Sequence, residues 1–536
     1  EMLEMIRRFD KVSVMPKIEV TGGDAFLHKN LKDNTNLATW DGELYLEMHR
    51  GTFTTKSNLK KANRTLEFKL RETELRAALA SLTGTSYPSE ELTECYKKFL
   101  LNQFHDILPG SHIHPVYEDA MNDYRSVSER LDAMLALTAG NEYFNSLNFT
   151  RSSITFIEDE NGAITRHGVK GFWSIPTLAG LSTGTVAALP SKENWLSTEF
   201  CDKCDCLVVE TPYYRAKLSS DGSFVSLYDK ELDREWVKEG CGFNKLHLYA
   251  DNPGVYDAWD ILPNYKDVQV ALNVDKPLAL VSSDGSSAEF AVTFTTEKST
   301  WKMILRFFAD SHAIEVENVV DWDEKHKLVK VNFGPDVLTR ELVCDTSAGF
   351  VKRDLTKNTS WQQARFEVCH HKWCDMSESG SGIAIINEGK YGVGLEKDEI
   401  SLSLLRATIR PDITSDIGHH DFCYTILPHS GDAVEAQVNK TAMEYNVPLC
   451  KSNVTVPAAL RDTLNNCGLY LQAMKRSEDG QYLILRLSEQ DGRRGKIAFP
   501  FEVQTMNLIE DIEGSTKVVS YHPFELITVA VKPEDL

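Results

Sequence analysis

The sequence predicts an α+β multidomain protein in which a helical region precedes a long series of antiparallel strands. Three amphipathic stretches with helical spacing lie between residues 56 and 135, and from about residue 142 onward the apolar residues alternate with polar ones. A three-helix bundle followed by large antiparallel β-sandwich domains explains both patterns. We therefore expect four regions: 1–46, the end of a β/α domain; 47–141, a three-helix middle domain; 142–449, a large β-sandwich region; and 450–536, a C-terminal β domain.

Residues 1–46 have the pattern of the end of an α/β unit. The stretch "EMLEMIRRFDK" is an amphipathic helix, and "VSVMPKIEVT" after it is expected to be a short extended segment. The chain begins with Glu1 and carries no secretory signal, so we expect it to be a piece of a longer protein.

Three helices are expected in the middle domain. Residues 56–80 carry leucines and alanine at spacings of three to five. Residues 89–106 form the second helix, with Ser89 as its N-cap and Pro109-Gly110 after its end. Ser111 is expected to cap the third helix, whose buried stripe consists of Val116, Ala120, Tyr124, Val127, Leu131 and Leu135.

The remainder of the chain has the two-residue period of half-buried strands. Turn residues separate these segments, and almost 400 residues of this kind indicate large sandwiches. The clearest strands are "SITFIE", "FAVTFTTE", "AIEVENVV", "LVKVNF", "GIAIIN", "YLILRLSE" and "LITVAVK".

Composition limits the partners. The formal net charge of −21 argues against nucleic acid and anionic membrane as partners and suits a neutral substrate. No apolar run reaches the ~18 residues that a membrane helix needs.

Eleven scattered cysteines indicate a reducing compartment, so we expect a cytoplasmic protein and rank a vacuolar or lysosomal location lower. The cluster "CDKCDC" (201–206) lacks a second Cys or His pair and is interpreted as an ordinary loop.

His105 and Asp106 form the most informative pair in the sequence. A His at a helix end is a good zinc ligand when it projects into a cleft. A His in this place also interacts favourably with the last helix carbonyls, and the residues alone favour that capping role. His112 and His114 lie nearby but flank the start of the next helix, where we expect them to face solvent.

Two further stretches have the composition of sugar sites. Residues 40–64 combine aromatic, carboxylate and His-Arg groups around His49, and residues 252–265 contain Tyr256 and Asp257 in a loop bounded by Pro and Gly. Surface loops have similar compositions, and an aromatic residue in such a loop often anchors it to a sheet. The adjacent histidines at 370–371 and 419–420 are expected to point to opposite faces of their strands and not to chelate one ion.

Together these stretches resemble glycoside hydrolase family 38, the α-mannosidases, and most closely its cytosolic, neutral branch. The motifs "ELYLEMHRGTFTT", "LLNQFHDILPGS", "YDAWDI", "NTSWQQARFEV", "INEGKYG" and "HHDFCYTILPH" occur in the order seen in that branch. The likeness extends over essentially the whole chain. It implies a β/α catalytic domain, a three-helix domain and C-terminal β-sandwiches.

The resemblance also implies a chemistry. The family is a retaining glycosidase family that holds one Zn²⁺ through two His and two Asp side chains. By this likeness His105 is a zinc ligand and not the helix cap that the residues alone favour. Asp106 binds a mannose hydroxyl. His49 stands where other branches place an aromatic that stacks on the sugar, and Tyr256 and Asp257 lie on a loop that closes over the site. Zn²⁺ is the expected cofactor, with Co²⁺ as an alternative, and a mannose-containing oligosaccharide is the expected substrate.

One departure from the family pattern is large. The N-terminal His-x-Asp zinc motif, the nucleophile and the acid/base Asp have no counterpart in the chain. We therefore expect this chain to be the C-terminal portion of an α-mannosidase that lacks the catalytic barrel and is inactive by itself. Two alternatives stay open: a non-catalytic carbohydrate-binding or scaffold protein, and a metal phosphohydrolase that uses the His-Asp doublet. A homo-oligomer is compatible with the sequence.

Overall fold

The computed structural model describes residues 1–34 and 36–536. The chain separates into two compact units, Glu1–Leu46 and Glu47–Leu536, which we describe one at a time. The expected boundaries at residues 141 and 449 fall inside the second unit and stay predictions. Among the helices of the described residues, none combines the length and the apolar character needed to cross a membrane.

The first unit contains helices α1 (Met2–Phe9) and α2 (Gly23–Leu31), neither of which has a buried residue. The expected helix at the N-terminus is confirmed. The extended segment expected at 12–21 is turn and irregular chain and not a strand. A strand needs a neighbour to pair its N–H and C=O groups, and no strand is found in residues 1–34 or 36–46.

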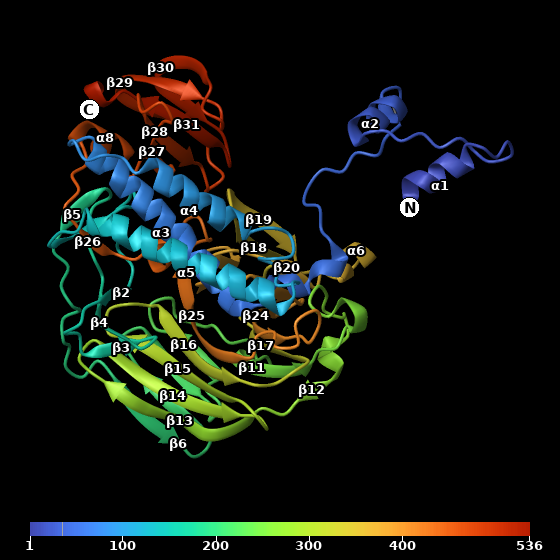
Figure 1. Ribbon diagram of the computed structural model, residues 1–536. Coiled ribbons are helices and arrows are strands. Elements are labelled where there is room, and N and C mark those ends of the chain that lie inside the picture. The colour runs from blue at the N-terminus through green and yellow to red at the C-terminus, as the bar shows by residue number, and fades with distance from the viewer. Residues whose placement is uncertain (35) are drawn as a thin grey trace. The chain divides into compact units, whose positions relative to one another are not determined.

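The second unit begins with three long helices, α3 (Ser57–Ser81), α4 (Ser89–Leu101) and α5 (His114–Ala136). Figure 1 shows them side by side between the C-terminal sheet, drawn in red, and the larger sheets. Their shared core confirms the centre of the predicted stripe of the third helix, whereas Val116 and Leu135 at its ends are only half-buried. This core consists of Leu59, Leu66, Leu70, Leu92, Cys95, Phe99, Ala120, Tyr124, Val127 and Leu131.

The ends of these helices differ from the prediction. Helix α4 stops at Leu101, so residues 102–106 form turns. Ser89 is the first helical residue and not the cap, which is Pro88. Helix α5 is preceded by Ile113, while Ser111 lies two residues further back and donates its hydroxyl to Asp106. Local propensity could not reveal that this serine is used inside the loop.

Two large sheets form the main sandwich. Phe333 and Tyr424 come from different sheets, and their ring centroids lie 5.9 Å apart in an edge contact. The nine-stranded sheet runs in the order β13 (Asn273–Ser283), β14 (Ser287–Thr295), β15 (Thr300–Phe308), β16 (Ile314–Trp322), β25 (Gly418–Ser430), β22 (Ser381–Asn387), β21 (Trp373–Glu378), β18 (Glu341–Thr346) and β19 (Gly349–Asp354). The six-stranded sheet runs in the order β12 (Gln269–Val270), β11 (Phe243–Ala250), β17 (Lys327–Phe333), β24 (Ile400–Ala407), β23 (Gly392–Leu395) and β20 (Glu367–Cys369).

Three smaller sheets flank this sandwich. One joins the start of the expected sandwich region to the start of the expected C-terminal domain, because Glu142 pairs with Ser452. Their orders are β26 (Cys450–Ser452), β1 (Glu142–Asn145), β5 (Ser182–Gly184); then β2 (Thr155–Glu158), β4 (Val169–Ser174), β3 (Ile164–Arg166); and β10 (Arg234–Glu235), β9 (Phe224–Asp229), β8 (Tyr214–Leu218), β7 (Cys206–Glu210), β6 (Ser197–Cys201).

The C-terminal sheet shares its core with the helical region. Leu75, Ala78 and Leu79 of α3 pack in one cluster with apolar residues of the sheet and of α8 (Ala458–Leu464). The strand order is β27 (Tyr470–Arg476), β28 (Leu483–Ser488), β31 (Leu526–Val531), β29 (Gly495–Met506) and β30 (Ile512–Tyr521). The remaining helices are α6 (Ser360–Ala364), α7 (Val438–Asn446), η1 (Glu47–His49), η2 (Gly51–Phe53), η3 (Gly254–Tyr256), η4 (Tyr265–Asp267) and η5 (Pro533–Asp535).

Candidate functional site

The short helices η1 and η2 stand where two of the predicted sugar-type stretches meet. The N–H of Gly51 donates to the carbonyl oxygen of Trp259 at 2.8 Å, and the Thr55 hydroxyl donates to that of Ala258 at 3.1 Å. A Cβ at Gly51 would lie 2.3 Å from a guanidinium nitrogen of Arg406, so only glycine allows this approach. Residues 47–64 of the first stretch and residues 252–265 are therefore neighbours in space.

Two arginines hold this junction together. Arg406 is fully buried, and it donates to the Asp251 carboxylate at 2.5 Å, the Thr55 hydroxyl at 3.1 Å and the Ala258 carbonyl oxygen at 3.2 Å. Arg50 donates to Asp260 at 3.0 Å. Planar guanidinium groups suit this work because each presents several donors in fixed directions. Arg50 belongs to the His-Arg pair of the predicted sugar-type stretch, whereas no sequence pattern pointed to Arg406.

His105 and Asp106 project from the turn that follows α4. The side chain of His105 is 75% exposed, and its Nε2 lies 3.5 Å from Oδ2 of Asp106. Oδ1 of Asp106 accepts a hydrogen bond from the Ser111 hydroxyl at 2.7 Å. The C-cap of α4 is Asn102, three residues earlier, so His105 does not cap this helix. Both side chains are thus open to solvent, and the bond from Ser111 orients the Asp106 carboxylate.

Hydrogen bonds from a buried lysine of α3 hold the loop that carries this pair. Lys60 is buried in α3, and its ammonium group donates to the carbonyl oxygens of Leu108 at 2.9 Å and Pro109 at 3.3 Å. Burial lowers the pKa of Lys60 to about 7. Gly110 has a φ of +84°, and a Cβ there would lie 2.6 Å from the carbonyl oxygen of Thr55.

His112 is not the solvent-facing residue that we expected. Its side chain is buried, its Nδ1 lies 3.0 Å from the Ile113 carbonyl oxygen, and burial lowers its pKa. The chain turns inward after Gly110 and stacks the imidazole beside the ring of Tyr117. His114 is exposed as expected, although its Nδ1 also lies 3.2 Å from the carboxylate of Asp412.

The carboxylates of Asp412 and Asp416 fasten α3 to the loop after β24. Oδ2 and Oδ1 of Asp416 accept from the backbone N–H groups of Lys56 and Ser57, each at 2.7 Å, where the positive end of the helix dipole favours a negative charge. The ammonium group of Lys56 donates to Asp412. Burial opposes ionisation of Asp412, but hydrogen bonds from Lys56 and Thr414 lower its pKa to about 2. Two aspartates four residues apart after Arg-Pro were the only sequence signal for this clamp.

Tyr256 and Asp257 take different places in their loop. Tyr256 is half exposed at the end of η3. Asp257 is buried, and its Oδ2 accepts from the N–H groups of Ile409 at 2.7 Å and Arg410 at 3.1 Å. Asp257 therefore anchors the loop, and Tyr256 is the member of the pair that faces solvent. His49 is half-buried, and the Thr52 hydroxyl donates to its carbonyl oxygen at 2.5 Å.

The described residues bring three metal-ligating side chains together at a single place, His167, Glu388 and Cys423. His105 is not part of that group. An imidazole is a donor that zinc accepts, so the exposed His105 fits one position of a zinc site, which needs further ligands. His419 and His420 behave as predicted, since His420 is buried while His419 is exposed beside Asp321. His370 and His371 lie between β20 and β21 and not on a strand, so the prediction of opposite strand faces was wrong for them.

Three sequence models of one family match the chain. They are the alpha mannosidase middle domain over residues 47–140, the glycosyl hydrolases family 38 C-terminal domain over 209–414, and the glycosyl hydrolases family 38 C-terminal beta sandwich domain over 468–529. The chain belongs to glycosyl hydrolase family 38. The predicted fold class and the predicted family are both confirmed.

Relatives of this family 38 chain are known from several organisms. Alpha-mannosidase 2C1 of Homo sapiens is 30% identical over 518 residues, which cover 92% of this chain and 49% of that protein. An alpha-mannosidase of Saccharomyces cerevisiae is 30% identical over 479 residues, 83% of this chain and 42% of that protein. The crystal structure of an alpha-mannosidase from Enterococcus faecalis superposes with a TM-score of 0.73 at 13% identity, covering 95% of this chain and 72% of that one. The family 38 chain thus spans about half the length of the curated relatives it matches.

Proposed function

We propose that this chain is the C-terminal portion of a retaining, zinc-assisted α-mannosidase that hydrolyses terminal α-mannosyl residues of free oligosaccharides. The observation that carries the proposal is the placement of His105 and Asp106. Both side chains are open to solvent, yet the buried Lys60 and the constrained Gly110 hold their loop in one position. A protein gains little from fixing two exposed polar groups unless they bind something.

Each residue has a stated part in this proposal. His105 is a zinc ligand through its neutral imidazole, and the remaining donors lie in the part of the relatives that this chain does not span. Asp106 accepts a hydrogen bond from a mannose hydroxyl, and its bond from Ser111 fixes the carboxylate plane. His49 and Tyr256 contribute further sugar contacts, while Asp257 holds the Tyr256 loop. Bound zinc, or Co²⁺ in its place, would grip sugar hydroxyls and stabilise charge that develops in the transition state.

The chain by itself is proposed to be inactive on α-mannosides. Family 38 membership supports a glycosidase and leaves the phosphohydrolase alternative without support. The non-catalytic carbohydrate-binding alternative keeps one observation in its favour, the exposure of Tyr256 on the same unit as His105. It differs from our proposal in a single measurable quantity, the hydrolysis of an α-mannoside.

The test compares the 536-residue chain with the product of its complete coding sequence. We expect the longer product to hydrolyse an aryl α-mannoside and the 536-residue chain not to do so. In the longer product His105→Ala should lose zinc and activity together, whereas Asp106→Asn should keep the metal and lose turnover. Full zinc content and near-normal turnover in His105→Ala would overturn the proposed ligand, and turnover by the 536-residue chain would overturn its proposed inactivity.

We further propose a cytoplasmic location, with a vacuolar or lysosomal one as the lesser alternative. All eleven cysteines are free thiols in the structure, which suits a reducing compartment. The proposed partner is a mannose-containing oligosaccharide, and the net charge of −21 disfavours nucleic acid and anionic membrane. Assembly with further copies of this chain is compatible with the proposal.

A further inference from the structure

A tight hairpin between β3 and β4 brings a histidine onto the face of the nine-stranded sheet. His167 and Gly168 are the two turn residues, with φ values of +50° and +75°, which is the geometry of a type I′ turn. The N–H of His167 donates to Oε1 of Glu317 in β16 at 2.8 Å. The imidazole is thereby held against β25, although it is distant from that strand in sequence.

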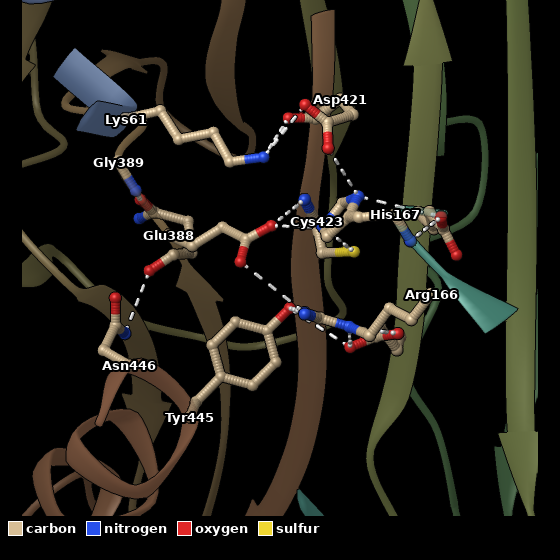
Figure 2. Close-up of polar contacts among 12 residues, drawn as sticks. Lys61, Arg166, His167, Glu388, Gly389, Asp421, Cys423, Tyr445 and Asn446 are labelled. Carbon is tan, nitrogen blue, oxygen red and sulfur yellow. Dashed lines mark hydrogen bonds and ion pairs between the residues drawn. The ribbon is translucent and has the colours of Figure 1, made fainter. Parts of the chain in front are cut away.

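Three potential ligand atoms meet at this hairpin tip, as Figure 2 shows. Nε2 of His167 lies 2.7 Å from Oε1 of Glu388 and 3.2 Å from Sγ of Cys423. Cys423 is buried, and the side chains of His167 and Glu388 are 12% and 19% exposed. The site is thus shielded but reachable from solvent.

The second imidazole nitrogen faces carboxylates. Nδ1 of His167 lies 3.3 Å from Oδ2 of Asp421 and 3.7 Å from Oε1 of Glu317. Nδ1 makes no hydrogen bond within the described residues, whereas Nε2 is directed at Glu388 and Cys423. A carboxylate behind a histidine in this way is the usual second-shell arrangement of metal-binding imidazoles.

The charges around the hairpin tip also leave room for a cation. The connected network contains five carboxylates and three permanently charged cations. Leaving His167 aside, the network has two more negative than positive charges, and a divalent ion together with the Cys423 thiolate that binds it would reduce this excess to one. The carboxylates are Glu289, Glu315, Glu317, Glu388 and Asp421, and the cations are Lys61, Arg166 and Arg306.

We propose that His167, Glu388 and Cys423 form a zinc site separate from the proposed catalytic zinc. A thiolate, an imidazole and a carboxylate form a donor set that selects zinc over magnesium or calcium. In a tetrahedral zinc site the N···O and N···S separations are about 3.3 and about 3.6 Å, so each observed distance has to open by only a few tenths of an ångström. On binding, the Cys423 thiol releases its proton to solvent and the zinc–sulfur bond forms.

Such a site would have a structural role. It would tie the β3–β4 hairpin to β25 and to the end of β22, three segments that are far apart in the sequence. In the competing arrangement no metal is bound, and Nε2 of His167 pairs directly with Glu388 through the observed 2.7 Å contact. The two arrangements differ in the state of Cys423, which is a thiolate only when zinc is bound.

Cobalt(II) is the probe that distinguishes them, since a thiolate ligand gives Co²⁺ a charge-transfer band in the near ultraviolet and a thiol does not. The reduced 536-residue chain is titrated with Co²⁺ at neutral pH, and zinc is then added. We expect one equivalent of thiolate-ligated cobalt, displaced by zinc. Cys423→Ser should abolish the band, and Glu388→Gln should weaken binding by more than the ~10–100-fold typical of second-shell changes.

Three controls isolate the site. Cys374→Ser removes another buried thiol and should leave the band unchanged. His105→Ala should also leave it unchanged, because the proposed catalytic zinc has no cysteine ligand. Cys201→Ser with Cys204→Ser removes a half-buried and an exposed thiol, which are the other source from which a band could arise, and should leave it unchanged as well.

Several results would overturn the proposal. They are the absence of a thiolate band in the unmodified chain, its survival in Cys423→Ser, or its loss in the Cys201 and Cys204 double variant. If Cys423→Ser fails to fold, the melting temperature with and without zinc is measured on the other variants instead. Zinc should raise the melting temperature of the unmodified chain and of Cys374→Ser but not that of Glu388→Gln, and an equal rise in all three would refute the site.

Discussion

The buried ammonium group of Lys60 donates to the carbonyl oxygen of Leu108 at 2.9 Å, two residues after Asp106. A side chain of α3 thereby fixes the backbone of the loop that displays His105 and Asp106. Lys60 also donates to the carbonyl oxygens of Thr55 and Pro109, so all three of its protons are used inside the protein. The exposed pair owes its position to a residue that solvent does not reach.

Replacing Lys60 by methionine should loosen this loop. Methionine keeps most of the volume but leaves one buried and two half-buried carbonyl groups without their donor, at an expected cost of about 1–3 kcal/mol in the free energy of unfolding. Lys69→Met, in the same helix but at a surface ion pair with Asp132, should cost less than about 1 kcal/mol. Chemical denaturation measures both, and faster amide exchange at residues 104–110 should appear in Lys60→Met alone. Equal exchange in the two variants would show that the clamp is not formed.

The same lysine should give the stability a characteristic pH dependence. The pKa of Lys60 is lowered by burial from its ordinary 10.5 to about 7. Between these values the unfolded chain binds one more proton at this residue than the folded chain, so stability increases with pH, by at most about 1.4 kcal/mol per unit. Below pH 7 both states are protonated and the effect is flat.

The measurement is the free energy of unfolding of the unmodified chain minus that of Lys60→Met at pH 7, 8 and 9. We expect this difference to increase with pH. Lys390, whose pKa burial also lowers to about 7, is present in both proteins and cancels. A difference that stays constant would mean that Lys60 keeps an ordinary pKa in the fold.

Gly110 should tolerate no side chain, for a reason beyond its φ. Gly84 also has positive φ (+100°), but a Cβ there meets nothing within 4 Å, whereas a Cβ at Gly110 would lie 2.6 Å from the Thr55 carbonyl oxygen. Both Ala variants therefore carry the same backbone strain of about 1–2 kcal/mol, and only Gly110→Ala adds a clash. We expect Gly110→Ala to be the less stable in thermal melts. Indistinguishable melting temperatures would place the loop further from Thr55.

The sequence predicted the elements better than their ends. The stripe from Ala120 to Leu131 identified α5 because burial on one helix face leaves a period in the sequence. The sequence could not show that α4 stops at Leu101 or that Ser111 bonds Asp106, because both depend on Lys60 and Thr55 meeting the loop in space. Boundaries set by tertiary contacts have no local pattern.

Much of the site was hidden for the same reason. His105 was found because it stands beside Asp106 in a family motif. The ion pair between Arg406 and Asp251 joins residues 155 positions apart in the sequence. The contact between His167 and Cys423 joins residues 256 positions apart. A strand of alternating residues predicts which face is buried, but not which distant charge lies across from it.

Tyr256 and Asp257 should respond oppositely to substitution. Tyr256 is half exposed, so Tyr256→Ala should change the free energy of unfolding by less than about 0.5 kcal/mol. Asp257→Asn weakens the acceptor of the Ile409 and Arg410 N–H groups and should cost about 1–3 kcal/mol. In the longer product Tyr256→Ala should raise KM for an aryl α-mannoside. Equal destabilisation by both substitutions would show that Tyr256 also anchors the loop.

The helices should be indispensable to the sheets that follow them. Leu75, Ala78 and Leu79 belong to the core of the C-terminal sheet, and Arg71 donates to the Leu471 carbonyl oxygen at 2.9 Å. Deleting residues 1–141 therefore exposes apolar surface of β27 and β28 and leaves buried backbone acceptors unpaired. Deleting residues 1–46 removes only helices that have no buried residue. We expect a fragment of residues 47–536 to melt cooperatively at the temperature of the whole chain. A fragment of residues 142–536 should melt at a lower temperature or without cooperativity, as followed by circular dichroism. A cooperative melt of the shorter fragment at an unchanged temperature would show that the sandwiches fold without α3, and would support residue 142 as a true domain boundary.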